Sequence, residues 1–214
     1  MYRDGEDVFY YVTVYNENYA QPPKPEGVDE GIVRGLYRFS AAPEIAGGAQ
    51  GRVRLVGSGS ILPQVIAARD LLAQRFGIAA EVYSATSFQQ LRHEALEVDR
   101  WNRLNPDQPE RVPYVAHVLG PEGGPIVAAT DWIRTLPDLV APWVRAPYLT
   151  LGTDGYGRSD TREALRRHFD VDPPSIAAAA ISGLARAGGW DPSAAASAIR
   201  ELGLDPASKG SLEA

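Results

Sequence analysis

Gly57-Ser58-Gly59-Ser60 is a turn whose residue types could bind an anion. It follows an apolar run and precedes a helical pattern, a geometry in which backbone amides and a helix N-terminus can hold a phosphate. The dinucleotide fingerprint needs a third glycine where Leu62 stands, and no Gly-Lys-Ser/Thr follows as in a Walker loop. Ser58 and Ser60 are therefore candidate ligands, while a tight strand-to-helix turn without a ligand is the favoured interpretation.

Residues 152–160 hold the densest group of polar side chains, directly after the last predicted strand. Open α/β sheets present ligands and interfaces at this end of their strands. Arg158 could bind a carboxylate or phosphate through two hydrogen bonds, or it could pair with Asp154 and Asp160 and only shape the loop. An interface or structural role is favoured over a small-ligand site. The candidate residues of this loop are Asp154, Tyr156, Arg158, Ser159 and Asp160, of which Ser159 or Asp160 is also expected to cap the next helix.

A third polar cluster follows the first apolar run of the chain and consists of Asn16, Glu17, Asn18 and Tyr19. These side chains could face a ligand, but a hydrogen-bonded turn is the commoner explanation. Neither this cluster nor the other two forms a Ser-His-Asp arrangement or the acidic pattern of a magnesium-diphosphate site. The sequence therefore predicts no catalytic, cofactor-binding or metal-binding residue in this chain.

The composition excludes several kinds of chemistry and partner. The 214 residues include no cysteine, which excludes a disulfide framework, a thiolate zinc site and a cysteine nucleophile. His93, His117 and His168 have no i, i+4 pair for a helical metal site, and His117 falls in a possible strand. With 21 basic and 27 acidic residues the net charge is −6, which argues against nucleic acid and anionic membranes as partners. No signal peptide or long apolar run is visible, so we expect a cytoplasmic protein.

The elements that must position these clusters alternate between strand and helix. Apolar residues 61, 65, 68, 72 and 76 form one helical stripe, which predicts a helix over 61–76 that ends at Gly77. Ser87 is expected to cap a charged helix whose Phe88, Leu91, Leu96 and Trp101 turn inward. Strands are predicted over 8–14, 52–57, 80–85, 125–130 and 148–152; helices over 61–76, 87–104, 131–144 with an interruption at Pro137, 161–169, 173–187 and 192–202; and a short helix or extended segment over 31–39. Such alternation with short connections predicts a doubly wound α/β domain with a mostly parallel sheet flanked by helices.

The first predicted strand, residues 8–14, stands apart from that domain. Pro22, Pro23 and Pro25 follow it and favour an extended linker rather than a helix or a central strand. Because a lone strand cannot bury itself, we expect its sheet to be supplied from elsewhere. The predicted division is therefore residues 1–29, a strand of a preceding domain with its linker, and residues 30–214, the α/β domain.

Six stretches in register, residues 10–19, 25–32, 55–62, 82–88, 99–102 and 151–160, resemble the homodimeric decarboxylating component of the bacterial pyruvate dehydrogenase complex. The resemblance covers the C-terminal portion of that enzyme, a transketolase-type C-terminal domain. It implies that the chain is part of a longer polypeptide whose preceding domains bind thiamine diphosphate and magnesium. It also implies a structural and dimerisation role, with three partners: the preceding domains, a second subunit, and the lipoyl acyltransferase of the complex.

The resemblance carries no catalytic residue onto this chain, and we expect the isolated chain to be inactive. Arg158 with its loop and the turn at Asn16 to Tyr19 are expected to lie at domain or subunit contacts. Two alternatives remain open at this stage. One is a stand-alone α/β domain that binds a small anion with Ser58, Ser60 and Arg158 at the carboxyl edge of the sheet, and the other is an allosteric module that binds a metabolite there while attached to the full enzyme.

Overall fold

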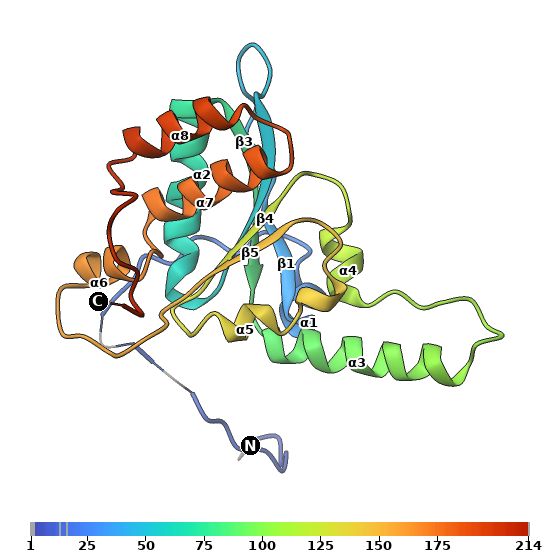
Figure 1. Ribbon diagram of the computed structural model, residues 1–214. Helices are drawn as coiled ribbons and strands as arrows, with labels where there is room; N and C mark the ends of the chain where they lie inside the picture. The colour runs from blue at the N-terminus through green and yellow to red at the C-terminus, as the bar shows by residue number, and fades with distance from the viewer. Residues whose placement is uncertain (1–2, 13, 16, 214) are drawn as a thin grey trace.

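A computed structural model describes residues 3–12, 14–15 and 17–213 of the chain. Its centre is a five-stranded sheet in the order β1-β3-β2-β4-β5, with helices on both faces (Figure 1). The strands are β1 (Leu36–Ser40), β2 (Gly51–Gly57), β3 (Ile78–Ala85), β4 (Ile126–Ala129) and β5 (Tyr148–Leu151). The helices are α1 (Asp29–Arg34), η1 (Gly59–Ile61), α2 (Leu62–Phe76), α3 (Phe88–Leu104), α4 (Tyr114–Leu119), α5 (Thr135–Asp138), η2 (Ala141–Trp143), α6 (Arg162–His168), α7 (Pro173–Arg186) and α8 (Pro192–Glu201).

The sheet is mostly parallel. Strand β2 pairs in parallel with β3 and β4, and β4 pairs in parallel with β5, while β1 alone runs antiparallel against β3. Helices α2, α7 and α8 close one apolar core against the sheet, and side chains of α3 and α4 close a second core on the opposite face. The predicted doubly wound α/β fold is confirmed.

Helix α2 shows how the apolar pattern produces this packing. All five stripe positions, Ile61, Val65, Ala68, Leu72 and Phe76, are at most 7% exposed, since the 3.6-residue period brings them onto the face that contacts the sheet and α7. Gly77 ends the helix in the left-handed region at φ 61°, and its N–H donates to the carbonyl of Leu72. The predicted helix and its end are confirmed.

The predicted strand over residues 8–14 stays a prediction, because its partner strands were expected to come from outside the α/β domain. Residues 8–12 and 14 form no ladder with a described strand, Phe9 and Tyr11 are 88% and 89% exposed, and Thr13 lies outside the described residues. β-branched and aromatic residues favour a strand, but a strand exists only where a neighbour accepts and donates its backbone hydrogen bonds. No described strand lies beside this segment.

Other differences are local. Residues 31–39 divide between α1 and β1 at Gly35, so both of the predicted conformations occur. His117 lies on α4 and is exposed, which corrects its placement in a strand. Leu96 on α3 is 44% exposed rather than turned inward. It follows Ala95 directly, and because one residue turns a helix by about 100°, Leu96 leaves the face on which Leu91 and Ala95 are buried. None of the described helices has the length and apolar character needed to cross a bilayer.

Because Tyr83 on β3 is buried, we expect the free energy of unfolding to fall at high pH. Burial, with a hydrogen bond of 2.8 Å to Glu81, raises the pKa of Tyr83 to about 12, whereas an unfolded tyrosine ionises near 10. Between these values the unfolded chain loses a proton that the folded chain keeps, so the free energy of unfolding falls by up to about 1.4 kcal/mol per pH unit. Urea unfolding across this window should show a shallower fall for Tyr83→Phe than for the wild type. Equal slopes would contradict the burial of an un-ionised Tyr83.

Candidate functional site

The carboxyl ends of three parallel strands bring polar side chains to one edge of the sheet. Ser58 follows β2, Thr130 follows β4, and the Ser58 Oγ donates a hydrogen bond of 2.8 Å to the Thr130 Oγ1. Thr153 follows β5, and its Oγ1 donates to the backbone carbonyl of Asp131 at 2.9 Å. The strand order β2-β4-β5 therefore assembles one polar surface from residues that are distant in sequence.

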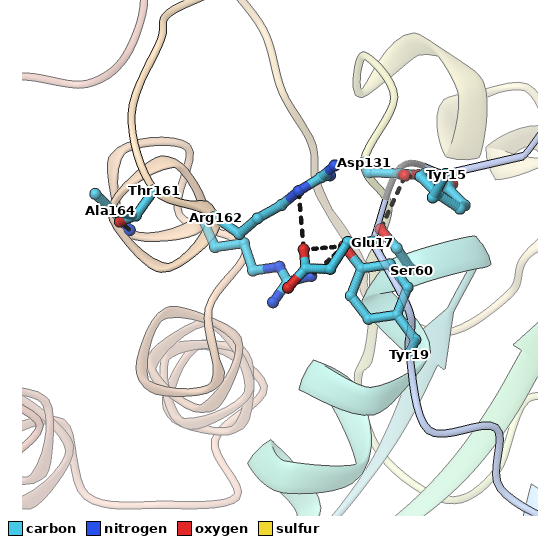
Figure 2. Close-up of polar contacts among 9 residues, drawn as sticks. Tyr15, Glu17, Tyr19, Ser60, Asp131, Thr161, Arg162 and Ala164 are labelled. Carbon is cyan, nitrogen blue, oxygen red and sulfur yellow. Dashed lines mark hydrogen bonds and ion pairs between the residues drawn. The ribbon is translucent and has the colours of Figure 1, made fainter.

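Asp131 is the centre of this surface. Its Oδ2 accepts hydrogen bonds from the Ser60 Oγ at 2.9 Å and from the Tyr15 hydroxyl at 2.6 Å (Figure 2). Burial, followed by the hydrogen bond to Asp131 and the charge of that residue, raises the pKa of Tyr15. The other oxygen, Oδ1, is buried and has no hydrogen-bond partner among the described residues. Gly59 (φ +52°) has Tyr15 close by, since a Cβ at this position would lie 3.1 Å from the Tyr15 hydroxyl.

The segment that carries Tyr15 continues across α6. The Glu17 carboxylate forms an ion pair of 3.0 Å with Arg162 and accepts a hydrogen bond of 3.1 Å from the Tyr19 hydroxyl. Arg166 donates to the same hydroxyl at 3.2 Å, and the rings of Tyr15 and Tyr19 meet edge to face with centroids 5.8 Å apart. Tyr15, Glu17 and Tyr19 form what we call the N-terminal clasp, which fastens the start of the chain to the carboxyl edge and to α6 (Figure 2).

Asn16 and Asn18 belong to the same predicted cluster as Glu17. Asn16 lies outside the described residues, and Asn18 is exposed. Glu17 combines the local hydrogen bond from Tyr19 with the long-range ion pair to Arg162 on α6, a contact that the turn interpretation did not include.

The loop after β5 is organised by Asp154, whose partner is Arg134. Asp154 accepts from the Arg134 backbone N–H at 3.0 Å and from the Arg134 side chain, and it does not pair with Arg158. Burial raises the pKa of Asp154, but the hydrogen bonds and charge of Arg134 outweigh it, so the net pKa lies below the usual range. The loop is thereby tied to the segment after β4.

The remaining loop residues take no part in that tether. Tyr156 is 94% exposed, and Arg158 and Ser159 are also exposed. Asp160 accepts a hydrogen bond of 2.7 Å from the N–H of Thr161, and Thr161 itself caps α6 by accepting from Ala164 at 3.2 Å. The predicted cap at Ser159 or Asp160 is therefore wrong, since the helix begins one residue later than expected.

Removing the charge of Asp154 should loosen the loop. A depressed carboxylate pKa stabilises the fold above the unfolded value near pH 4, and the effect is lost as the pH falls through the folded value. Asp154→Asn should therefore lower the free energy of unfolding by about 1 kcal/mol at pH 7 and much less at about pH 3. Asp160→Asn is the matched control in the same loop, and urea unfolding at both pH values checks the pair. Equal losses in the two variants would contradict the tether.

Asp131, Tyr15, Arg134, Arg162 and Arg166 were not predicted from the sequence. A signal for Asp131 existed, because the residues after every parallel strand belong to the same edge, and Thr130 and Asp131 follow β4 as Ser58 follows β2. The arginines had no such signal, since their roles depend on which segment packs against them.

The described residues do not offer a metal site. No group of three His, Asp or Glu side chains within residues 3–12, 14–15 and 17–213 is arranged to hold an ion. At the carboxyl edge only Asp131 combines a central position with a buried carboxylate oxygen, and its Oδ2 is already bonded to Ser60 and Tyr15. The side chains at this edge therefore do not fit a magnesium-diphosphate group, which needs several oxygen ligands around the ion.

Comparison with known proteins gives the family of this fold. The family model described as the transketolase-like TK C-terminal domain matches residues 35–172. The pyruvate dehydrogenase E1 component of Pseudomonas aeruginosa is 43% identical over the whole chain, which covers 24% of that protein, and the E1 component of Escherichia coli K12 is 44% identical over 94% of the chain, which covers 22% of it. Among solved structures, transketolase from Leishmania mexicana matches 73% of the chain and 19% of its own, with 18% identity and a TM-score of 0.48.

These matches confirm the resemblance to the pyruvate dehydrogenase component that six stretches of the sequence indicate. The chain spans about a quarter of the length of the pyruvate dehydrogenase relatives. The family model covers the sheet from β1 through β5 together with α6, which includes every element that positions the carboxyl edge. The chain belongs to the transketolase-like C-terminal domain family.

Proposed function

We propose that this chain is the C-terminal structural and dimerisation domain of a thiamine-diphosphate-dependent pyruvate dehydrogenase subunit. The observation that carries the proposal is the match to pyruvate dehydrogenase E1 components, which extends over the whole chain but only over about a quarter of the relative. The intact subunit would decarboxylate pyruvate in the cytoplasm and pass the acetyl group to the lipoyl group of an acyltransferase. Thiamine diphosphate would supply the electron sink for that step.

The cofactor and its magnesium ion belong, in this proposal, to the domains that precede the chain. The lack of fit at the carboxyl edge supports this assignment, because the described side chains there provide one committed carboxylate rather than a ligand set. The chain would contribute to catalysis only by holding the preceding domains and the second subunit in place.

We further propose the division at residues 1–29 and 30–214, with the first part packed against a preceding domain. The apolar side chains of Phe9, Tyr10, Tyr11, Val12 and Val14 are between 73% and 89% exposed, and such a continuous stretch is typical of a protein contact. The N-terminal clasp would then set the orientation between the two domains, since it fixes the point at which the linker leaves the edge.

Immunoprecipitation from the source cells with an antibody raised against this chain tests the proposal. The precipitate should decarboxylate pyruvate only with thiamine diphosphate and magnesium, and it should contain the sequence of a pyruvate dehydrogenase catalytic domain, either on the same polypeptide or bound to it. Recovery of this chain without such a sequence and without activity would overturn the proposal. A thiamine-independent activity in the precipitate would overturn it as well.

A further inference from the structure

A cavity of about 300 Å³ lies beside the N-terminal clasp at the carboxyl edge of the sheet. Arg158, Arg162 and Arg166 line it on the side of α6, and Ser60 and Asp131 line it on the side of the sheet. Ile61, Leu165, Phe169 and Val171 give it an apolar portion. The volume is at the lower end of the range of small-molecule sites, which runs from about 300 to 1,000 Å³.

The charges around the cavity are unbalanced. Arg158 forms no hydrogen bond or ion pair with any residue that the structure describes, and Arg166 donates only to the neutral Tyr19 hydroxyl among those residues. Arg162 pairs with Glu17, which supplies a carboxylate from within the chain. Apart from the paired Arg162, two guanidinium groups, those of Arg158 and Arg166, therefore face one lining carboxylate, that of Asp131, and guanidinium groups bind carboxylates and phosphates with charge-assisted hydrogen bonds.

Asp131 is the carboxylate that lines the cavity. Its Oδ2 is satisfied by Ser60 and Tyr15, whereas its Oδ1 is buried without a partner among the described residues. Because Oδ1 has almost no accessible surface, a ligand in the cavity does not reach it, and the arginines are the groups that the site offers to a ligand.

We infer that this cavity is a binding site for a small organic anion, a carboxylate or a phosphate ester. Arg158 would form the main ion pair with the anion, and Arg166 on α6 would add a second positive charge beside it. Glu17 occupies Arg162 as an internal carboxylate and competes with the ligand for that side chain. This inference does not rest on the proposed function, because it uses only contacts within the chain.

Three probes separate the requirements of the site: glycerate, glycerol 3-phosphate and glycerol. Calorimetric titration of the 214-residue chain at constant ionic strength should show saturable binding of at least one of the two anions, with a Kd of about 1 mM or tighter. Which anion binds more tightly decides between a carboxylate and a phosphate ligand. Glycerol, which has the hydroxyl groups without the charge, should not bind. Binding of neither anion, or equal binding of glycerol, would overturn the inference.

Matched variants locate the site. Arg158→Gln should weaken binding of the preferred anion by about fivefold or more, because it removes a charge-assisted hydrogen-bond donor. Glu17→Gln should tighten binding, because it removes the competing carboxylate. Arg145→Gln, an exposed arginine before the opposite end of β5, is the control and should leave the affinity unchanged. Equal losses in Arg158→Gln and Arg145→Gln would show a general charge effect and overturn the site, and so would an unchanged affinity in Arg158→Gln. Thiamine diphosphate is absent throughout, so the outcome is independent of the test of the proposed function.

Discussion

Replacing Arg54 by methionine should lower the free energy of unfolding by about 3 kcal/mol or more. Arg54 is the largest fully buried side chain among the residues that the structure describes, 1% exposed in the middle of β2. Its Nη1 donates to the carbonyls of Leu119 and, at 3.1 Å, Gly120, and its Nη2 donates to the carbonyl of Gly124 at 2.7 Å. One side chain thus satisfies three backbone acceptors between α4 and β4.

The sign of this prediction depends on two opposing effects. Burial lowers the pKa of Arg54, although Tyr83 and Glu81 on the neighbouring strand raise it in part, and losing a buried charge removes that desolvation cost. Methionine nevertheless leaves the buried Leu119 carbonyl and the partly buried bonds to Gly120 and Gly124 without this donor, and an orphaned buried acceptor costs about 1–3 kcal/mol. The sum of the lost bonds exceeds the relief, so the variant is destabilised.

Arg52→Met is the matched control, because Arg52 lies two residues away on the same strand and is exposed. It should change the free energy of unfolding by no more than about 0.5 kcal/mol. Urea unfolding of the three proteins at pH 7 makes the comparison. Equal effects of the two substitutions would show that the bonds of Arg54 do not hold the 119–124 segment.

Replacing Gly124 by alanine should cost about 3 kcal/mol or more, the second large effect that we expect. Gly124 has φ +81°, a region that side chains other than glycine rarely adopt. A Cβ at this position would lie 2.0 Å from the carbonyl oxygen of Arg52, which belongs to the central strand β2. Neither the strand nor the turn can move without disturbing the β2–β4 pairing that begins at Arg54 and Ile126.

Gly120→Ala separates the contact from the conformation. Gly120 lies at the other end of the same segment with φ +58°, and nothing lies within 4 Å of the point that a Cβ would occupy there. Its substitution should cost about 1–3 kcal/mol, which reflects the backbone conformation at φ 58° and ψ 175° alone. Thermal unfolding of both variants gives the comparison. A loss in Gly124→Ala no greater than that in Gly120→Ala would contradict the close approach to Arg52.

The α/β core could be predicted from the sequence because its information is local. Ile61, Val65 and Leu72 repeat with the helical period, and their burial follows from any sheet that the helix covers. Ser87 was expected to cap α3, and its side chain does accept from the N–H of Gln90. Periodicity and capping depend on neighbours within one or two turns, so one segment contains the whole signal.

The carboxyl edge was predicted as a location but not as a set of contacts. The rule for parallel sheets indicates Ser60 and Asp154, whereas the partner of Ser60, Asp131, and the partner of Asp154, Arg134, were missed. The Tyr15 to Asp131 hydrogen bond joins residues 116 positions apart, and no pattern within either segment encodes it. The predicted strand over 8–14 stays a prediction for a related reason, because a strand needs a partner strand that this segment does not contain.

The most direct test of the central proposal is a calorimetric titration of the purified 214-residue chain with thiamine diphosphate in the presence of magnesium. A cooperative thermal transition measured on the same sample ensures that the chain is folded. We predict no saturable heat of binding, because the residues that hold this cofactor would lie in domains that precede the chain. Saturable binding with a Kd in the micromolar range, which corresponds to a binding free energy of about −8 kcal/mol, would contradict the assignment of this chain as a non-catalytic domain.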